Sequence, residues 1–267
     1  MALGIGILRL ISISSFALSL QAASIVAYVE APTLQWSSVN GVAVETFDTL
    51  GAGIASSGFA SVIGEYGGSP TTPFAIVSAN EYGGAGGTGQ YFAAGTEANS
   101  DAPVTLTLNA NANYFGFWWS AGDPNNTITF LRNGVALATF TTSNLIALLP
   151  HGVDGKVTAI NGDVYNTDDY YGNPNDRTDP LEPFAYVDVI ATGLVFNQIQ
   201  FANTNSTGFE SDNHSVAAGV MAPPAGDVIV QDVPLTAAAE TPEPSTYLLF
   251  TAGVCAFGLL RTRRNRQ

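Results

Sequence analysis

Short runs in which apolar and polar residues alternate cover much of the chain between residues 25 and 235. Residues 104–108 alternate with a period of two, as expected of a strand with one buried face. The segments 127–132 and 135–140 flank Asn133-Gly134, a pair that predicts a tight hairpin. Similar runs predict further strands at residues 114–120, 184–190, 195–202, 215–220 and 227–230.

Only one short helix is expected in this region. Ser143 suits an N-cap, an apolar run follows to residue 149, and Pro150 ends the run. The polar stretch 151–183 predicts a long loop or an irregular hairpin. We therefore expect an all-β fold, a single β-sandwich over residues 25–235, of the jelly-roll kind.

The N-terminal segment has the organisation of a signal peptide. Arg9 precedes an apolar stretch at 10–20, and Ala22, Ala23 and Ser24 are small residues that suit signal peptidase. A buried N-terminal helix is the alternative, but it would place several serine hydroxyls in a core without partners. We expect residues 1–24 to direct export through the Sec translocon and to be removed by signal peptidase.

The C-terminal segment 242–267 has three parts and follows an Ala-rich linker at 236–241. A proline motif comes first, then an apolar run at 247–260, then a basic cluster. A helix over that run rises about 21 Å, which is short of the roughly 30 Å hydrocarbon core. The positive-inside rule keeps the basic cluster cytoplasmic and the preceding chain outside. The motif is Pro242, Glu243, Pro244 and Ser245, and the cluster is Arg261, Arg263, Arg264 and Arg266.

This tail resembles the PEP-CTERM sorting signal of Gram-negative bacteria. A sortase signal would need Leu-Pro-x-Thr-Gly, and a lipid-anchor tail would lack the arginines. The resemblance implies that an exosortase, a membrane protease, recognises the proline motif, cuts the chain and sends the protein from the inner membrane to the cell surface or extracellular matrix. Pro242 and Pro244 favour the extended backbone that a protease requires. The alternative is an ordinary transmembrane anchor that is never cut.

Four internal segments carry a second resemblance. Residues 82–89, 114–123, 182–185 and 207–214 are similar to a cyanobacterial and proteobacterial family of exosortase-dependent surface proteins. That family has no established enzymatic activity. The resemblance implies a location more than a reaction. We expect such a surface protein to be associated with exopolysaccharide.

The net charge of −14 limits the classes of partner that the protein can bind. Between residues 25 and 241 only Arg132, Lys156 and Arg177 are basic, so the exported body repels phosphate backbones and anionic lipid. We expect no nucleic-acid partner. The single cysteine, Cys255, lies in the apolar tail, so no disulfide is expected within the body.

The surplus of acids suggests a calcium hypothesis. In jelly-roll carbohydrate-binding modules, an acid after an early aromatic residue and an acid near the last strand often bind calcium, which suggests Asp48 with Glu210 or Asp212. The alternative is that Asp212 caps a turn. The acids of the polar loop suit either a solvated surface or a calcium loop; they are Asp163, Asp168, Asp169, Asp176 and Asp179.

Trp118 and Trp119 raise the hypothesis of sugar binding. Adjacent residues on a strand point to opposite faces, so one ring belongs to the core and the other faces outward or toward a second sheet. An outward ring could stack on a sugar. Burial of both rings is the competing interpretation.

No catalytic residue and no organic cofactor are predicted. Residues 84–89 match G-x-G-x-x-G, but the flanking strand and helix of a dinucleotide site are missing, so we interpret them as a glycine loop. His151 and His214 are expected to be exposed in loops. Three hypotheses remain: a non-enzymatic surface or matrix protein, a lectin-like carbohydrate-binding module, and an exported glycoside hydrolase with a carboxylate pair.

Overall fold

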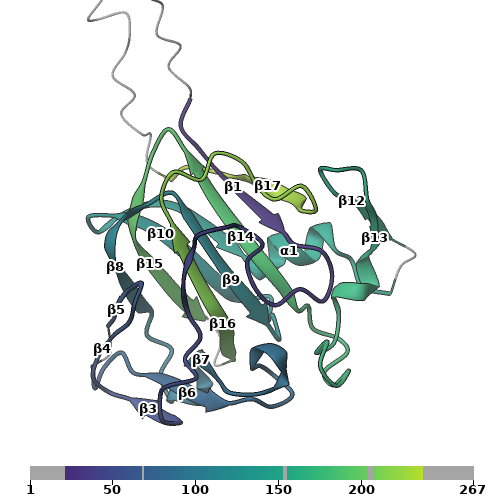
Figure 1. The fold of residues 1–267 in the computed structure, drawn as a ribbon. Helices are drawn as coiled ribbons and strands as arrows, with labels where there is room; N and C mark the ends of the chain where they lie inside the picture. Colours follow the sequence, from purple (N-terminus) through teal and green to yellow (C-terminus); the bar gives the residue numbers. More distant parts are fainter. Residues whose placement is uncertain (1–21, 68, 153–154, 204–206, 237–267) are drawn as a thin grey trace, which may run out of the picture. The chain divides into compact units, whose positions relative to one another are not determined.

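Antiparallel β-strands make up most of the regular structure, which confirms the all-β prediction (Figure 1). The computed structural model describes residues 22–67, 69–152, 155–203 and 207–236. The predicted signal peptide lies almost entirely outside these residues. The proline motif, the apolar run and the arginine cluster lie wholly outside them. Within the described ranges, no helix is both long and apolar enough to cross a membrane.

The larger sheet has nine strands, all paired antiparallel. The first described strand, β1 (Ser24–Val29), lies between β14 and β17, close to one edge. Strand β2 (Ala43–Glu45) pairs with residues 214–216 of β16, whereas β7 pairs with residues 208–211 of the same strand. The order of the other strands is β17 (Val228–Val233), β1, β14 (Ala185–Thr192), β9 (Tyr114–Ser120), β16 (Gly208–Ala217), β7 (Gln90–Gly95), β6 (Phe74–Ser78) and β3 (Gly53–Ala55).

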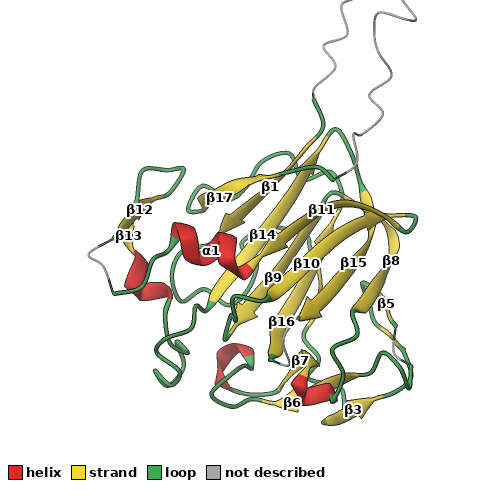
Figure 2. Ribbon diagram, turned by 180° about the vertical axis from the view of Figure 1, so that it is seen from behind, coloured by secondary structure: helices red, strands yellow, loops and turns green. Residues whose placement is uncertain are grey.

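The smaller sheet has six strands and faces the first (Figure 2). Its order is β11 (Val135–Thr141), β10 (Asn126–Arg132), β15 (Phe196–Asn203), β8 (Val104–Ala112), β5 (Gly64–Tyr66) and β4 (Phe59–Ala60). After β17 the chain reaches this sheet, because Leu235 forms a bridge with Ala138 and the Thr236 amide donates to the Leu137 carbonyl. The end of β17 is therefore tied to both sheets.

The hairpin predicted at Asn133-Gly134 is confirmed. Strands β10 and β11 pair over almost their whole length, and the two turn residues have φ angles of 52° and 81°. Two consecutive positive φ angles match the twist of the flanking strands, and asparagine followed by glycine adopts them at low cost.

The short helix α1 (Thr142–Leu148) follows β11 directly, but its cap differs from the prediction. Thr141 is the N-cap, not Ser143: its hydroxyl accepts from the Asn144 amide, and the Asn144 side chain accepts from the Thr141 amide. This reciprocal pair is a capping box, which satisfies donors that a helix start leaves free. The Ser143 hydroxyl instead donates to the Pro124 carbonyl.

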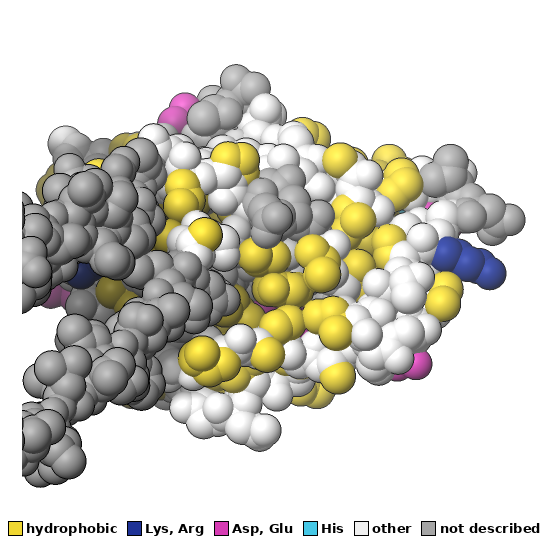
Figure 3. Space-filling view, turned by 90° about the horizontal axis from the view of Figure 1, so that it is seen from above, with side chains coloured by type: hydrophobic (Ala, Val, Ile, Leu, Met, Phe, Trp, Pro, Cys, Tyr) yellow, Lys and Arg dark blue, Asp and Glu magenta, His cyan; other side chains and the backbone are white. Residues whose placement is uncertain are grey.

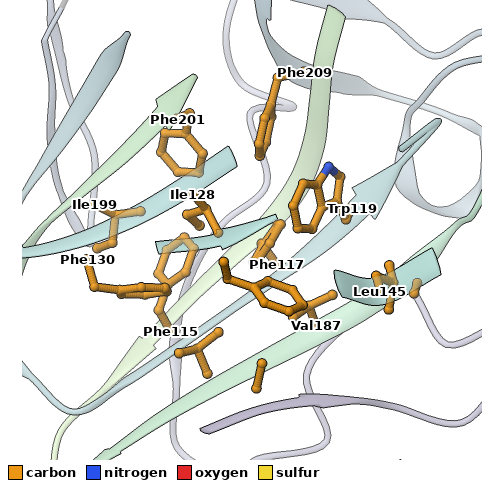
Figure 4. Packing of buried hydrophobic residues seen from close by; sticks show 14 of the residues in the cluster. Phe115, Phe117, Trp119, Ile128, Phe130, Leu145, Val187, Ile199, Phe201 and Phe209 are labelled. Carbon is orange, nitrogen blue, oxygen red and sulfur yellow. The ribbon is translucent and has the colours of Figure 1, made fainter. Parts of the chain in front are cut away.

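Aromatic side chains from both sheets fill the space between them. Phe115, Phe117 and Trp119 project from alternate positions of β9 into the core (Figure 4). Phe115 meets Phe130 and Phe201 of the facing sheet, and Trp119 meets Phe140. The alternation places Tyr114, Gly116 and Trp118 on the opposite face of β9. That outer face is the one on which most of the buried polar groups described below are found.

The irregular hairpin that was one of the two expectations for residues 151–183 is present, whereas one predicted strand start needs correction. The polar stretch 151–183 contains a two-stranded hairpin, β12 (Lys156–Thr158) with β13 (Val164–Asn166), and one turn of 3₁₀ helix, η3 (Thr167–Tyr170). Strand β16 begins at Gly208, seven residues before the predicted strand start at Ser215. A register shift between Asp212 and Ser215, with Asn213 at φ 48°, interrupts the alternation on which the prediction was based.

Exposed apolar side chains are interspersed with polar surface (Figure 3). Scattered exposure of this kind is normal for a folded protein. The features that call for a functional interpretation are therefore the polar groups that the fold encloses.

Candidate functional site

An acidic pocket of about 280 Å³ opens among the loops at the start of β16. Two short helical turns frame this region, η1 (Ala85–Gly87) and η2 (Thr96–Ala98). The pocket is lined by Tyr82, Thr96, Glu97, Ala121, Asp123, Glu182, Thr207, Gly208 and Glu210.

The four segments that carry the second sequence resemblance meet at this pocket. Segment 82–89 contributes Tyr82, segment 114–123 contributes Asp123, and segment 182–185 contributes Glu182. Segment 207–214 contributes Glu210 together with the two residues at its start. Stretches separated by up to 125 positions along the chain thus come together around one hollow, which makes it the leading candidate site.

Glu210 and Glu97 form the deeper pair of acids. Glu210 is 4% exposed. Burial and the neighbouring Glu97 carboxyl, with which it shares a hydrogen bond, raise the pKa of Glu210 well above its ordinary value. One buried oxygen of Glu97 has no amide, hydroxyl or basic donor among the described residues. A Cβ atom at Gly208 would collide with the Glu210 carboxyl, so glycine is required there.

Glu182 and Asp179 form a second pair at the rim. Burial, followed by the hydrogen bond with Asp179 and the charge of that residue, raises the pKa of Glu182 to about 8. Of the five acids expected to form a solvated loop, four are exposed and only Asp179 is partly buried. The pocket therefore carries less negative charge at neutral pH than its composition suggests.

The chemistry of this pocket suits cations or hydroxyl groups and disfavours phosphates. Carboxyl groups bind hard cations and accept from sugar hydroxyls, and none of the described residues that line the hollow is basic. The two carboxyls within each pair lie closer together than the catalytic carboxyls of a glycosidase, which stand at least about 5 Å apart. Within each pair here, the two carboxyls share a hydrogen bond.

A second, amide-lined pocket of about 410 Å³ lies between the loops 79–87 and 173–178. The Asn173 side chain donates to the carbonyls of Asn80 and Glu81, and Asn175 contacts Gln35. These bonds hold the loops 79–87 and 173–178 together. The lining is Ala79, Asn80, Glu81, Gly86, Gly87, Asn173, Asn175, Asp176 and Thr178.

The two tryptophans do not offer a surface for sugar stacking. Trp119 lies in the core between the sheets, and Trp118 lies on the outer face beneath Phe184 and Ala85; both are 0% exposed. The loops 84–87 and 171–184 cover the ring that the strand directs away from the core. The hypothesis that Trp118 or Trp119 binds a sugar therefore does not fit the geometry.

The predicted calcium ligands Asp48, Glu210 and Asp212 are not brought together as a group of three. Asp212 is buried and accepts from the amides of Ala85 and Asn213, and the exposed Asp48 accepts from the Gln90 amide. These bonds support the alternative in which Asp212 fixes a loop. The glycine loop at 84–89 is thus bound to β16 through Asp212, in agreement with its interpretation as a structural loop.

The two histidines have opposite surroundings. His151 is exposed, as predicted, and stacks on Tyr171. His214 is 0% exposed, so its prediction as a loop residue was wrong. Its ring lies between Phe47 and Phe201, and burial lowers its pKa to about 3. The ring has no route to a substrate and is a core residue.

Comparison of the chain with protein-family models, with curated proteins and with solved structures finds no match.

Proposed function

We propose that this chain is a non-enzymatic exported protein of the cell surface or extracellular matrix, which an exosortase sorts and cuts through its C-terminal tail. The observation that carries the proposal is the three-part tail, with Pro242 and Pro244, the short apolar run and the arginine cluster. The acidic body supports the same assignment, because it would repel nucleic acid and anionic lipid.

The body that the tail delivers is proposed to be a β-sandwich of the jelly-roll kind. Two antiparallel sheets with one hydrophobic cluster between their inner faces support this assignment. A fold built this way presents its loops at the ends of the sheets, where both polar pockets lie, and can bind a ligand in the matrix while the core remains rigid.

The mass of the mature protein tests the sorting proposal. Intact-mass spectrometry of the exported protein is expected to show loss of the residues after the proline motif in cells that contain the exosortase. Deletion of the exosortase, or Pro242→Ala with Pro244→Ala, is expected to leave the tail attached. The control Pro223→Ala should be cut normally. A full-length C-terminus in wild-type cells would refute the proposal.

A second candidate function is the binding of a neutral polysaccharide in the amide-lined pocket. Side-chain amides and glycine backbone suit the recognition of sugar hydroxyls without a charge on the ligand. Asn175→Ala is expected to abolish binding on a glycan array, and the exposed control Asn109→Ala should retain it. Equal glycan binding by both variants would show that the amide-lined pocket is not the binding site.

A further inference from the structure

Three carboxylates that no sequence pattern had linked gather on the outer face of the nine-stranded sheet. Glu30, Asp188 and Asp227 each place a carboxylate oxygen within 4.8 Å of the other two. They are 2%, 0% and 0% exposed. This acidic cluster is separate from the acidic pocket and shares no residue with it.

The register of the strands brings the three acids together. Glu30 directly follows β1, and its amide donates to the Tyr186 carbonyl of β14. Tyr28 pairs with Asp188 on one side of β1, and Val29 pairs with Val228 on the other, so Glu30 and Asp227 are neighbours across that side. Residues directly opposite each other on paired strands share a face of the sheet, and so do residues two apart on one strand. Tyr28 pairs with Asp188 and lies two residues before Glu30, so Glu30 and Asp188 project to the same side.

Loops and the β12–β13 hairpin enclose the acidic cluster from above. The Tyr170 hydroxyl donates to the Glu30 carbonyl, and the amide of Ile160, in the hairpin turn, donates to the Asp227 carbonyl. Figure 1 shows this hairpin standing beside β1 and β17. Below the cluster, Gly116 lies opposite Asp188, and a Cβ atom at Gly116 would collide with the Tyr114 hydroxyl and crowd Asp188. The strand thus leaves room where the acids converge.

The hydrogen-bond donors around the acidic cluster do not suffice for three carboxylates. Glu30 accepts from the amide and the hydroxyl of Ser38, and one oxygen of Asp188 accepts from Tyr114 at 2.5 Å. The other oxygen of Asp188 and both oxygens of Asp227 are buried, and among the described residues only the neighbouring carboxyls of the cluster, when protonated, could donate to them. Buried polar atoms without partners are rare in native proteins and call for an explanation.

No basic side chain supplies the missing positive charge. Arg132, Lys156 and Arg177 are the basic residues within the described ranges, and all three are exposed. Buried charges are normally paired or bound to a metal ion.

We propose that Glu30, Asp188 and Asp227 bind a calcium ion. Two oxygens on opposite sides of Ca²⁺ at about 2.4 Å are separated by about 4.8 Å, so oxygens within that limit can share one ion. Magnesium binds at about 2.1 Å in a near-octahedral set, whereas calcium accepts a wider and more flexible arrangement of oxygens. An all-oxygen donor set excludes a preference for softer metals. The ion would join β1, β14 and the start of β17.

Titration of the full chain in mild detergent, after removal of divalent ions, tests this site. Calorimetry with CaCl₂ and the shift of the melting temperature with Ca²⁺ measure binding. Asp227→Asn is expected to weaken calcium binding by more than about tenfold and to remove the shift. Asp48→Asn, at a position suggested by the sequence, should bind as the wild type does. The circular dichroism spectrum of each variant verifies its fold.

Terbium luminescence locates the ion without removal of a ligand. Tb³⁺ replaces Ca²⁺, and excitation of nearby tyrosines makes it emit. Tyr114 touches Asp188, whereas Tyr82 lines the acidic pocket. Tyr114→Phe is expected to lower the emission, and Tyr82→Phe should leave it unchanged. The proposal is overturned if the wild type shows no calcium-dependent shift, if Asp227→Asn binds equally well, or if only Tyr82→Phe dims the emission.

Discussion

Two fully buried polar clusters show how differently a fold can accommodate polar atoms. Around His214, the Tyr66 hydroxyl bonds Nδ1 at 2.6 Å and the Ser211 hydroxyl bonds Nε2 at 2.8 Å, and aromatic rings surround the rest. A neutral imidazole donates from one nitrogen and accepts at the other, and either hydroxyl can take the complementary role. Every polar atom of the ring has a partner, so the His214 cluster is complete in itself.

The acidic cluster on the outer face lacks that balance. Burial, with the charge of Glu30, raises the pKa of Asp188 to about 8; burial, with the charge of Asp188, raises the pKa of Asp227 to about 10. Without a cation, the cluster must hold protons at neutral pH. The contrast teaches that burial alone does not identify a binding site, whereas burial together with unsatisfied atoms of like charge does.

The largest effect is expected from removal of the His214 ring. His214→Ala would leave a cavity in the aromatic core and two hydroxyls without partners, at a cost of about 3–5 kcal/mol. Urea unfolding followed by tryptophan fluorescence measures the loss. The control His151→Ala removes the exposed histidine and should change stability by less than about 0.5 kcal/mol. Equal effects would mean that the His214 cluster adds little to the core.

The next effect is a dependence of stability on pH. The unfolded chain takes up a proton on His214 below about pH 6.5, and the folded chain does so only near pH 3. Stability contributed by the neutral ring is therefore lost as the pH falls below 6.5, at a slope approaching about 1.4 kcal/mol per pH unit.

The variant His214→Gln isolates this contribution. Carboxyls with raised pKa values oppose the trend, but they are common to the variant and the wild type. Denaturant unfolding between pH 6.5 and 4 should show a flatter dependence in the variant, with a difference of about 3 kcal/mol over the window. Parallel curves would contradict the assignment of a neutral buried ring.

The smallest effect comes from a matched pair of hydroxyl deletions. Tyr66→Phe and Tyr114→Phe each remove one buried oxygen, and each should cost about 1–2 kcal/mol. Only the Tyr114→Phe cost should change when calcium is added, because that hydroxyl bonds to a proposed ligand. A calcium-dependent cost at Tyr66 would show that the two clusters are coupled.

The alternation of residues and the turn residues predicted the strands. The candidate sites depend on loops that cover the sheet, and those loops are placed by contacts between residues far apart in sequence. Asn133-Gly134 fixes its hairpin through two residues that tolerate positive φ, so the sequence sufficed there. Asp188 stands in an alternating strand, where a polar residue normally indicates a solvent-facing side. Only the folded chain shows that the hairpin and loops close over that side and place Glu30 and Asp227 beside it.

Long-range contacts also account for the wrong prediction at His214 and for the burial of both tryptophans, the second of the two interpretations of those rings. The irregular register of β16 at Asn213 concealed that His214 belongs to a strand and points into the core. Trp118 was correctly assigned to the face opposite Trp119. Whether that face is exposed or buried depends on the loops that cover it. Their contacts, such as the hydrogen bond from the Ala85 amide to Asp212, join residues far apart in sequence.

The bridge from Leu235 to β11 has a mechanical consequence. If the protein is tethered through its C-terminal tail, tension on the tether reaches the contacts of Leu235 and Thr236 with β11 before it reaches the pairing of β17 with β1. The load is then divided between the two sheets, and the edge strand is protected from being peeled away one hydrogen bond at a time.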